Sequence, residues 1–132
     1  VLADPGLARQ LANELGPWAV SGPARYLMAR ALQDRAWQVE ARASLQTARL
    51  RMDGLLRKSG MPIPAGTLLF RTVQHPRAAD IAEQLARRGI LVRRFDAPAA
   101  LRFGLPPDET GWQRLEGALS ELTYLIDHPH PG

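Results

Sequence analysis

Apolar residues recur at three- and four-residue spacing in the first part of the chain, a pattern that predicts helices. The first helix is expected to run from Pro5 to about Leu15. Asp4 is a good N-cap, Pro5 fits the first helical turn, and Gly16 stops the helix. Residues 16–23 then form an extended loop, because the two prolines and two glycines in that stretch forbid a continuous helix.

A long helical region is expected from about Pro23 to Lys58. It carries two apolar stripes that fall out of phase near residues 34–37, so we expect a kink or break there. The residues that define the stripes are Leu27, Met28, Ala31 and Leu32, and then Ala41, Leu45, Ala48, Met52 and Leu55. Gly60 and the two prolines that follow it end the region.

Runs of strand-forming residues bounded by turn residues appear in the second half of the chain. The expected elements are a strand over Thr67–Gln74, a helix from His75 to about Arg88, strands over Ile90–Phe95 and Leu101–Leu105, and a last helix capped by Pro106-Pro107-Asp108. The order helix–helix–helix–strand–helix–strand–strand–helix predicts an α/β (α+β) fold. In such a fold, helices pack on a small antiparallel or mixed sheet.

Composition narrows the classes of function. The 132 residues suit one domain, no apolar run is long enough to cross a bilayer, and the absence of cysteine fits a cytoplasmic protein. Lysine and arginine total 17 and give a net charge of +4, but the arginines are spread along predicted helices among acidic residues. That spread, and a lack of aromatic residues interleaved with arginine on the strands, argues against a nucleic-acid binder.

The stretch from Gly89 to Pro106 predicts two short apolar strands joined by a tight loop, with Arg93 on one strand and Arg102 on the other. Two guanidinium groups side by side form a receptor for carboxylate or phosphate, because the planar fork of arginine pairs bidentately with such anions. Arg93 and Arg94 point to opposite faces, and we expect Arg93 to be the inward one, which requires an internal acid or a ligand. The alternative is a pair of edge-strand arginines whose charged ends reach water.

Other residue types that often carry chemistry do not assemble an active site. Lys58 is the single lysine and lies at a polar helix end, where we expect it to be solvated. His75 lies at a helix start and is expected to cap it or to face solvent. His128 and His130 with Asp127 are a weakly specific combination in a tail, so no metal site is assigned. Glycine-rich phosphate motifs and a nucleophile elbow are missing, and no catalytic residue is assigned.

Trp18 and Ser21 form a separate pair of interest in the loop before the long helical region. A tryptophan in an irregular segment is commonly core filler. It can also line a ligand pocket when prolines hold the loop rigid, as Pro17 and Pro23 would here. Trp18 and Ser21 are therefore possible pocket residues.

Three segments together carry a resemblance to a known family: GPWAVSGPA at 16–24, GILVRRF at 89–95 and LRFGLPPDETGWQRLEGAL at 101–119. They resemble the C-terminal part of the threonine-phosphate decarboxylases of cobalamin biosynthesis. These are fold-type I pyridoxal-phosphate enzymes and close relatives of the histidinol-phosphate aminotransferases. The resemblance extends to about Leu122 and implies the small C-terminal domain of that class, in an enzyme that forms a homodimer.

The resemblance also implies roles for the two arginines. Arg102 matches the residue that grips the substrate carboxylate, and Arg93 matches a second arginine for the carboxylate–phosphate end of O-phosphothreonine or another phosphorylated amino acid. Pyridoxal phosphate acts as the electron sink in the complete enzyme. The family's Schiff-base lysine belongs upstream of this chain, and Lys58 does not match it. We therefore predict that the chain alone neither holds the cofactor covalently nor turns over substrate.

This interpretation divides the chain into residues 1–24, leading from a missing large cofactor-binding domain, residues 25–124 as the small domain, and residues 125–132 as a flexible tail. The expected partners are that large domain and a second subunit, with no nucleic acid and no membrane. Two other interpretations stay open: a fragment of a histidinol-phosphate-type aminotransferase, and a stand-alone α+β ligand-binding module.

Overall fold

The computed structural model describes residues 4–62 and 64–127. It divides into two compact units, Val1–Val39 and Glu40–Gly132. The expected division at residues 24 and 25 concerns the complete protein and stays a prediction. None of the helices within the described residues has both the length and the apolar composition needed to cross a bilayer.

The first unit consists of helices and their connections. Helix α1 spans Pro5–Leu15, and the Asp4 carboxylate accepts hydrogen bonds from the backbone N–H groups of Gly6 and Leu7 at 2.8 and 3.2 Å. Gly16 ends α1 with a φ of 66°, a left-handed conformation that glycine adopts without strain. The predicted first helix, with its cap and its stop, is confirmed.

The predicted break in the long helical region is also confirmed. Helix α2 spans Gly22–Ala31, and α3 begins at Arg35 and runs to Lys58. Asp34 lies between the two helices, and its carboxylate accepts a hydrogen bond from the backbone N–H of Trp37 at 2.9 Å. This bond satisfies one of the unpaired donors in the first turn of α3, so the chain starts a new helix there.

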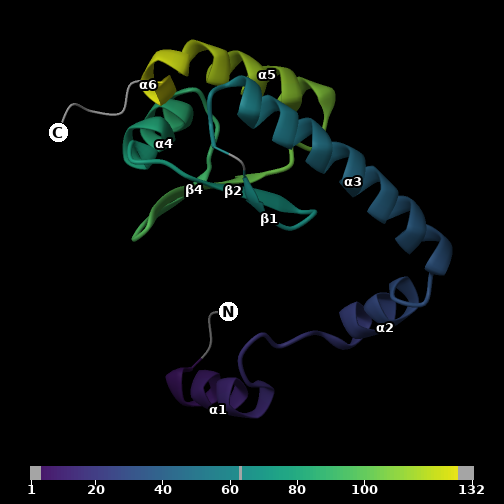
Figure 1. The fold of residues 1–132 in the computed structure, drawn as a ribbon. Helices are drawn as coiled ribbons and strands as arrows, with labels where there is room; N and C mark the ends of the chain where they lie inside the picture. Colours follow the sequence, from purple (N-terminus) through teal and green to yellow (C-terminus); the bar gives the residue numbers. More distant parts are fainter. Residues whose placement is uncertain (1–3, 63, 128–132) are drawn as a thin grey trace. The chain divides into compact units, whose positions relative to one another are not determined.

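The second unit contains a four-stranded antiparallel sheet in the order β1-β2-β4-β3. Figure 1 shows α4 and α5 on one side of this sheet. The remaining elements are β1 (Ala65–Gly66), β2 (Phe70–Gln74), α4 (Ala78–Arg87), β3 (Arg93–Asp96), β4 (Ala99–Gly104), α5 (Glu109–Glu121) and α6 (Thr123–Asp127). A small sheet with helices packed on it is the predicted α+β architecture, which is thereby confirmed.

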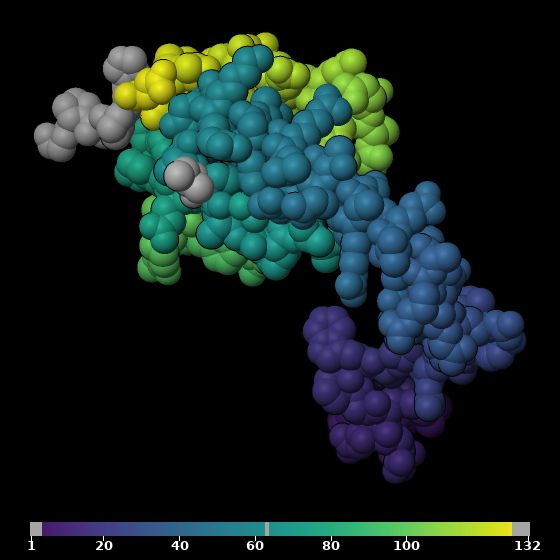
Figure 2. All heavy atoms as spheres, turned by 45° about the vertical axis from the view of Figure 1, so that its right-hand side comes forward, coloured from purple at the N-terminus to yellow at the C-terminus, as the bar shows by residue number. Residues whose placement is uncertain are grey.

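The hydrophobic core of the second unit lies between the sheet and its helices. Alternate residues of β2 and β4 point into it, and the second half of α3 packs beside α5, as Figure 2 shows. The most completely buried large side chains are Met52, Leu56, Val73, Ile81, Leu85, Leu101, Phe103, Leu119 and Leu122. The opposite face of the sheet carries none of these residues, and no helix within residues 40–62 and 64–127 covers it.

Asp53 and Arg71 form a buried ion pair that joins α3 to the sheet. Their side chains are 11% and 8% exposed, and Arg71 Nε donates to Asp53 Oδ1 at 2.6 Å. Arg71 Nη2 also donates to the carbonyl oxygen of Pro64 at 2.7 Å, and Arg49 donates to the other carboxylate oxygen of Asp53 at 3.2 Å. Because several hydrogen bonds satisfy both charges, the pair can exist away from water.

Three expectations about element boundaries are wrong in part. The strand expected over 67–74 begins only at Phe70, and residues 67–69 connect it to β1. Gly66, at the end of β1, has a φ of 131°, and a Cβ there would collide with the carbonyl oxygen of Phe70. The strand expected from Ile90 begins only at Arg93. Residues 125–127, assigned to the tail, belong to α6, which buries Leu125 and Ile126, whereas 128–132 lie outside the described residues. Each error concerns an end, where long-range packing overrides local pattern.

Replacing Arg71 with methionine should destabilise the second unit by about 3–5 kcal/mol, because it leaves the Asp53 carboxylate buried with Arg49 as its remaining charged partner. The free energy of unfolding from urea titrations, followed by circular dichroism, measures this. Arg87→Met is the matched control: Arg87 pairs with Glu83 on the surface, so its loss should cost less than about 1 kcal/mol. Equal losses in the two variants would contradict the central role of the buried pair.

Arg51 of α3 and Glu109 at the start of α5 form a second, exposed link between helices. Arg51 donates from Nη1 and Nη2 to the two carboxylate oxygens of Glu109 at 2.6 and 2.7 Å, and its Cζ lies 4.6 Å from the ring centre of Trp112. These hydrogen bonds lower the pKa of Glu109 and raise the pKa of Arg51 from their ordinary values. The folded state therefore favours the carboxylate form of Glu109 over the protonated form.

Acid should weaken this link. A carboxyl group whose pKa is lower in the folded than in the unfolded protein stabilises the fold above its unfolded pKa of about 4.3, and this contribution is lost as the pH falls through the folded pKa. Glu109→Gln should therefore flatten the decline in unfolding free energy below about pH 4 relative to the unchanged protein. Urea titrations at a series of pH values test this, and parallel declines in both proteins would refute it.

Candidate functional site

The uncovered face of the sheet brings together the two arginines singled out from the sequence. Arg93 of β3 lies directly opposite Arg102 of β4, and Thr72 of β2 lies opposite Arg102 on its other side. Directly opposite residues of antiparallel strands project from the same face. The predicted hairpin with two arginines side by side is therefore confirmed, and its two-residue turn is Ala97-Pro98.

The burial expected for Arg93 is wrong. We expected Arg93 to point inward, but it is exposed, and so is Arg94. Arg94 lies opposite the core residue Leu101, on the helix-covered face, where it pairs with Asp96 at 3.0 Å. The two neighbouring arginines do point to opposite faces. Because β3 is an edge strand with few neighbours, neither of its arginines becomes enclosed.

Two phenylalanines hold the guanidinium groups on the uncovered face. The Cζ atom of half-buried Arg102 lies 4.8 Å from the ring centre of Phe70 and 5.8 Å from that of Phe95. The Cζ atom of Arg93 lies 5.4 Å from the same Phe95 ring. Both arginines thus lie within the range at which an aromatic face attracts a cation. The expectation that no aromatic residue is interleaved with arginine on the strands is therefore wrong.

Neither arginine is neutralised within the part of the chain that the structure describes. Among residues 4–62 and 64–127, no carboxylate forms an ion pair with Arg93 or Arg102, and neither guanidinium donates a hydrogen bond. Like charges at directly opposite positions repel each other. A pair of positive groups held side by side without a counter-ion can bind an external carboxylate or phosphate, and such binding relieves the repulsion.

A shallow hollow of about 360 Å³ lies beside Arg102 on this face. Its floor contains Ala100, whose small side chain leaves space between the flanking strands, and Thr72 and Gln74 add a hydroxyl and an amide to its wall. The lining residues are Phe70, Thr72, Gln74, Phe95, Ala97, Pro98, Ala100 and Arg102. Apolar walls with a few polar groups and one cation suit a small organic anion.

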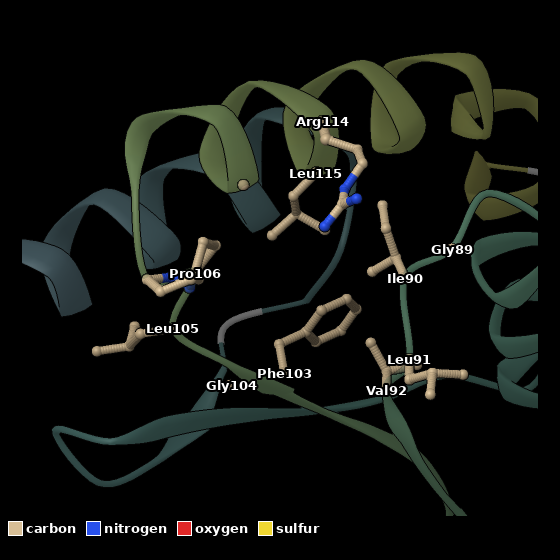
Figure 3. A pocket seen from close by; sticks show the side chains of 12 residues that line it. Gly89, Ile90, Leu91, Val92, Phe103, Gly104, Leu105, Pro106, Arg114 and Leu115 are labelled. Atoms are coloured by element: carbon tan, nitrogen blue, oxygen red, sulfur yellow. The ribbon is translucent and has the colours of Figure 1, made fainter.

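Another hollow, of about 250 Å³, lies between α5 and the ends of the strands and contains neither arginine of the pair. Figure 3 shows the side chain of Arg114 reaching from α5 toward Ile90 at its edge. The other walls come mainly from apolar residues such as Phe103 and Leu105. The hollow therefore lies apart from the anion receptor that the sequence predicts.

The loop residues Trp18 and Ser21 belong to the first unit. Trp18 has a φ of 65°, which is rare for a bulky residue, and the residue is 93% exposed, so it is not core filler within that unit. The Ser21 hydroxyl accepts a hydrogen bond from the backbone N–H of Ala24 at 3.4 Å and caps α2. A pocket role for these two residues stays a prediction.

The remaining residues weighed from the sequence have structural contacts. Lys58 Nζ pairs with Glu116 Oε1 at 3.2 Å, and its side chain is 77% exposed, as expected for a solvated lysine. His75 accepts a hydrogen bond from the backbone N–H of Arg77, the N-cap of α4, but α4 has no side-chain cap hydrogen bond. The histidine is buried and its Nε2 contacts the carbonyl oxygen of Ile126, so the expectation that His75 caps the helix or faces solvent is wrong. No metal-binding cluster of His or acidic residues occurs within the described ranges, outside which His128 and His130 lie.

Pyridoxal phosphate would need a lysine positioned for a Schiff base and a cradle for its phosphate. Lys58 is exposed, bound to Glu116 of α5, and belongs to a helix on the opposite side of the sheet from the Arg102 face. The described residues therefore do not fit this cofactor, although they do fit an organic anion.

Comparison with known proteins tests the resemblance that the sequence segments carry. The chain is 47% identical over 118 residues to a threonine-phosphate decarboxylase from Pseudomonas aeruginosa and 42% identical over 123 residues to one from a Sinorhizobium species. The chain is similar to threonine-phosphate decarboxylases. These matches cover 89% and 92% of this chain but 36% of each relative. No family model matches the chain.

The resemblance inferred from three sequence segments is therefore confirmed over about nine-tenths of the chain. The chain spans about a third of the length of each decarboxylase, 36% in both cases. The two phenylalanines were missed at the sequence level. Phe95 is two residues from Arg93 and hence on the same face of a strand, which is a local signal, whereas the contact of Phe70 with Arg102 depends on pairing between strands distant in sequence.

Inorganic phosphate should stabilise this chain more than sodium chloride at equal ionic strength, because a ligand bound only by the folded state raises its stability. At ten times the dissociation constant the gain is about 1.4 kcal/mol. Thermal unfolding midpoints in the two salts measure the difference. Arg102→Gln should remove it, whereas Arg94→Gln, on the other face, should keep it. A difference that survives Arg102→Gln would place the phosphate elsewhere.

Proposed function

We propose that this chain is the C-terminal, substrate-binding part of a pyridoxal-phosphate-dependent threonine-phosphate decarboxylase. The observation that carries the proposal is the similarity of about nine-tenths of the chain to two proteins of that name. The unneutralised pair of arginines on the uncovered face supports a substrate-binding role. The partial coverage of both relatives is the pattern expected of a piece of a longer enzyme.

In this proposal the substrate is O-phosphothreonine, and its chemistry explains why two arginines are needed. The molecule carries a carboxylate and a phosphate ester, and both are acceptors for bidentate, charge-assisted hydrogen bonds. Arg102, half-buried and held between two rings, binds the carboxylate, and Arg93 binds the phosphate end. Loss of the carboxylate as CO2 yields (R)-1-aminopropan-2-ol phosphate, a building block for cobalamin.

The cofactor is assigned to residues outside this chain, since the described residues do not fit it. Pyridoxal phosphate supplies the electron sink for the decarboxylation when it is bound in the complete enzyme. The residues of this chain hold and orient the substrate, and orientation decides which bond to the α-carbon breaks. The chain alone is therefore proposed to be inactive, with its Schiff-base lysine supplied by the missing large domain.

Three further features belong to the same proposal. Trp18 and Ser21 lie in the GPWAVSGPA loop and contribute to the substrate pocket of the complete enzyme. That enzyme is a cytoplasmic homodimer.

A histidinol-phosphate-type aminotransferase is the second candidate, because it shares the paired arginines. Release of CO2 from O-phosphothreonine identifies the decarboxylase, whereas transfer of the amino group to a keto acid identifies the aminotransferase.

Substitution of either arginine in the complete protein tests the substrate-binding role. Arg102→Ala and Arg93→Ala should each weaken the binding of O-phosphothreonine by about 2–4 kcal/mol, because each leaves one anionic group of the substrate without its donor. The KM for O-phosphothreonine should rise roughly 30- to 700-fold in each variant.

Arg94→Ala is the control for this experiment. Arg94 is adjacent in sequence and equally charged, but it lies on the helix-covered face and pairs with Asp96. Its replacement should leave the KM within about twofold, since lost net charge alone acts weakly at physiological salt. If Arg94→Ala and Arg102→Ala raise the KM alike, a general charge effect explains the result and the assigned site is wrong.

A further inference from the structure

Four arginines in the described residues stack on aromatic rings, and they differ in what else they contact. Arg51 lies over Trp112 and also pairs with Glu109, and Arg30 lies over Tyr26 and donates to its hydroxyl. Arg93 and Arg102 have the ring contacts alone. For Arg93 and Arg102, the aromatic rings are therefore the groups that hold the guanidinium group in its orientation.

A contact between an arginine and an aromatic ring leaves the arginine able to bind an anion, whereas an ion pair with a carboxylate does not. A carboxylate that fixes an arginine also uses its charge and its hydrogen-bond donors, so an incoming anion must displace it. An aromatic face attracts the cation through its quadrupole and leaves the edge of the guanidinium group, with its N–H donors, free for a ligand. Stacking therefore orients an arginine while preserving its ability to bind an anion.

Phe95 occupies a special position in this arrangement. Its ring contacts both guanidinium groups, with Cζ distances of 5.4 Å to Arg93 and 5.8 Å to Arg102, and Phe70 contacts Arg102 from its other side. Each arginine side chain has several rotatable bonds, and two like charges at opposite positions would otherwise move apart. A ring shared by both arginines keeps them together on one face.

We propose that Phe95, assisted by Phe70, is a positioning residue that holds Arg93 and Arg102 in the geometry that binds an anionic group of the substrate. This inference rests on the proposed function, in which the two arginines bind O-phosphothreonine. Phe95 is assigned no contact with a reacting atom. It acts through the arginines by removing part of the conformational entropy that ligand binding would otherwise cost.

Kinetics of the complete, cofactor-loaded protein test the proposal. Phe95→Leu removes the ring but keeps apolar bulk, and it should raise the KM for O-phosphothreonine about five- to thirtyfold, because two cation–ring contacts are lost. Phe70→Leu removes one contact and should raise the KM about two- to fivefold. In both variants kcat should change less than about twofold, since binding is impaired but chemistry is not.

Two further variants separate positioning from a merely structural role. Phe95→Trp restores an aromatic face and should return the KM to within about twofold of the unchanged protein. Tyr26→Leu removes the ring beneath Arg30, a similar exposed stack in the first unit, and should leave the KM unchanged. Where Arg102→Ala raises the KM, equal KM values for Phe95→Leu and Phe95→Trp would overturn the proposal, as would an unchanged KM in Phe95→Leu.

Titration with inorganic phosphate, followed by the NMR signals of the arginine Nε–H groups, needs no turnover and separates this inference from the proposed function. The midpoint should rise at least about threefold in Phe95→Leu. If it does, but Arg102→Ala leaves the KM for O-phosphothreonine unchanged, the positioning role stands and that substrate is wrong. An unchanged midpoint in a Phe95→Leu protein that remains folded overturns the positioning role.

Discussion

The buried ion pair between Asp53 and Arg71 determines which side chains of β2 point to each face of the sheet. Arg71 must point toward α3, because its charge is satisfied there by Asp53 and by the carbonyl oxygen of Pro64. Side chains alternate along a strand, so Phe70 and Thr72 must point the other way. Thr72 lies opposite Arg102, and Phe70 lies beneath the Arg102 guanidinium. A charge buried on one face of β2 therefore places an aromatic ring on the other face.

The structure handles arginine in two distinct ways on the two sides of this sheet. On the helix-covered side three arginines are neutralised by carboxylates: Arg71 by Asp53, Arg88 by Glu121 and Arg94 by Asp96. On the uncovered side the two arginines are held by aromatic rings and keep their charge. Neutralised arginines stabilise contacts between elements, whereas stacked arginines remain available to ligands. The same residue type thus has a structural role on one face and a binding role on the other, and the partner determines which.

Local pattern predicts the helices well, together with the break before α3 and the pairing of Arg93 with Arg102. Caps, prolines and glycines act over a few residues, and a short hairpin brings its strands together over a few more. The inward arginine was assigned to the wrong strand: the enclosed one is Arg71, whose partner Asp53 lies 18 residues away on another element. Arg71 and Arg93 both stand in apolar, β-forming surroundings, so sequence does not separate them. Burial depends on which strand lies at the edge, and that order emerges only when the sheet assembles.

The turn at Ala97-Pro98 contains only two residues, and it joins strands in which Asp96 lies opposite Ala99. Because successive side chains alternate between faces, the length of this turn determines which face Arg93 reaches. A single inserted residue that shifted β3 by one position would move Arg93 beneath the helices and bring Arg94 beside Arg102. The composition of the site would hardly change, but Phe95 would leave the uncovered face, and the stack would be lost. Relatives that keep this receptor should therefore preserve the length of the turn more strictly than its residues, so that gaps in an alignment fall outside it.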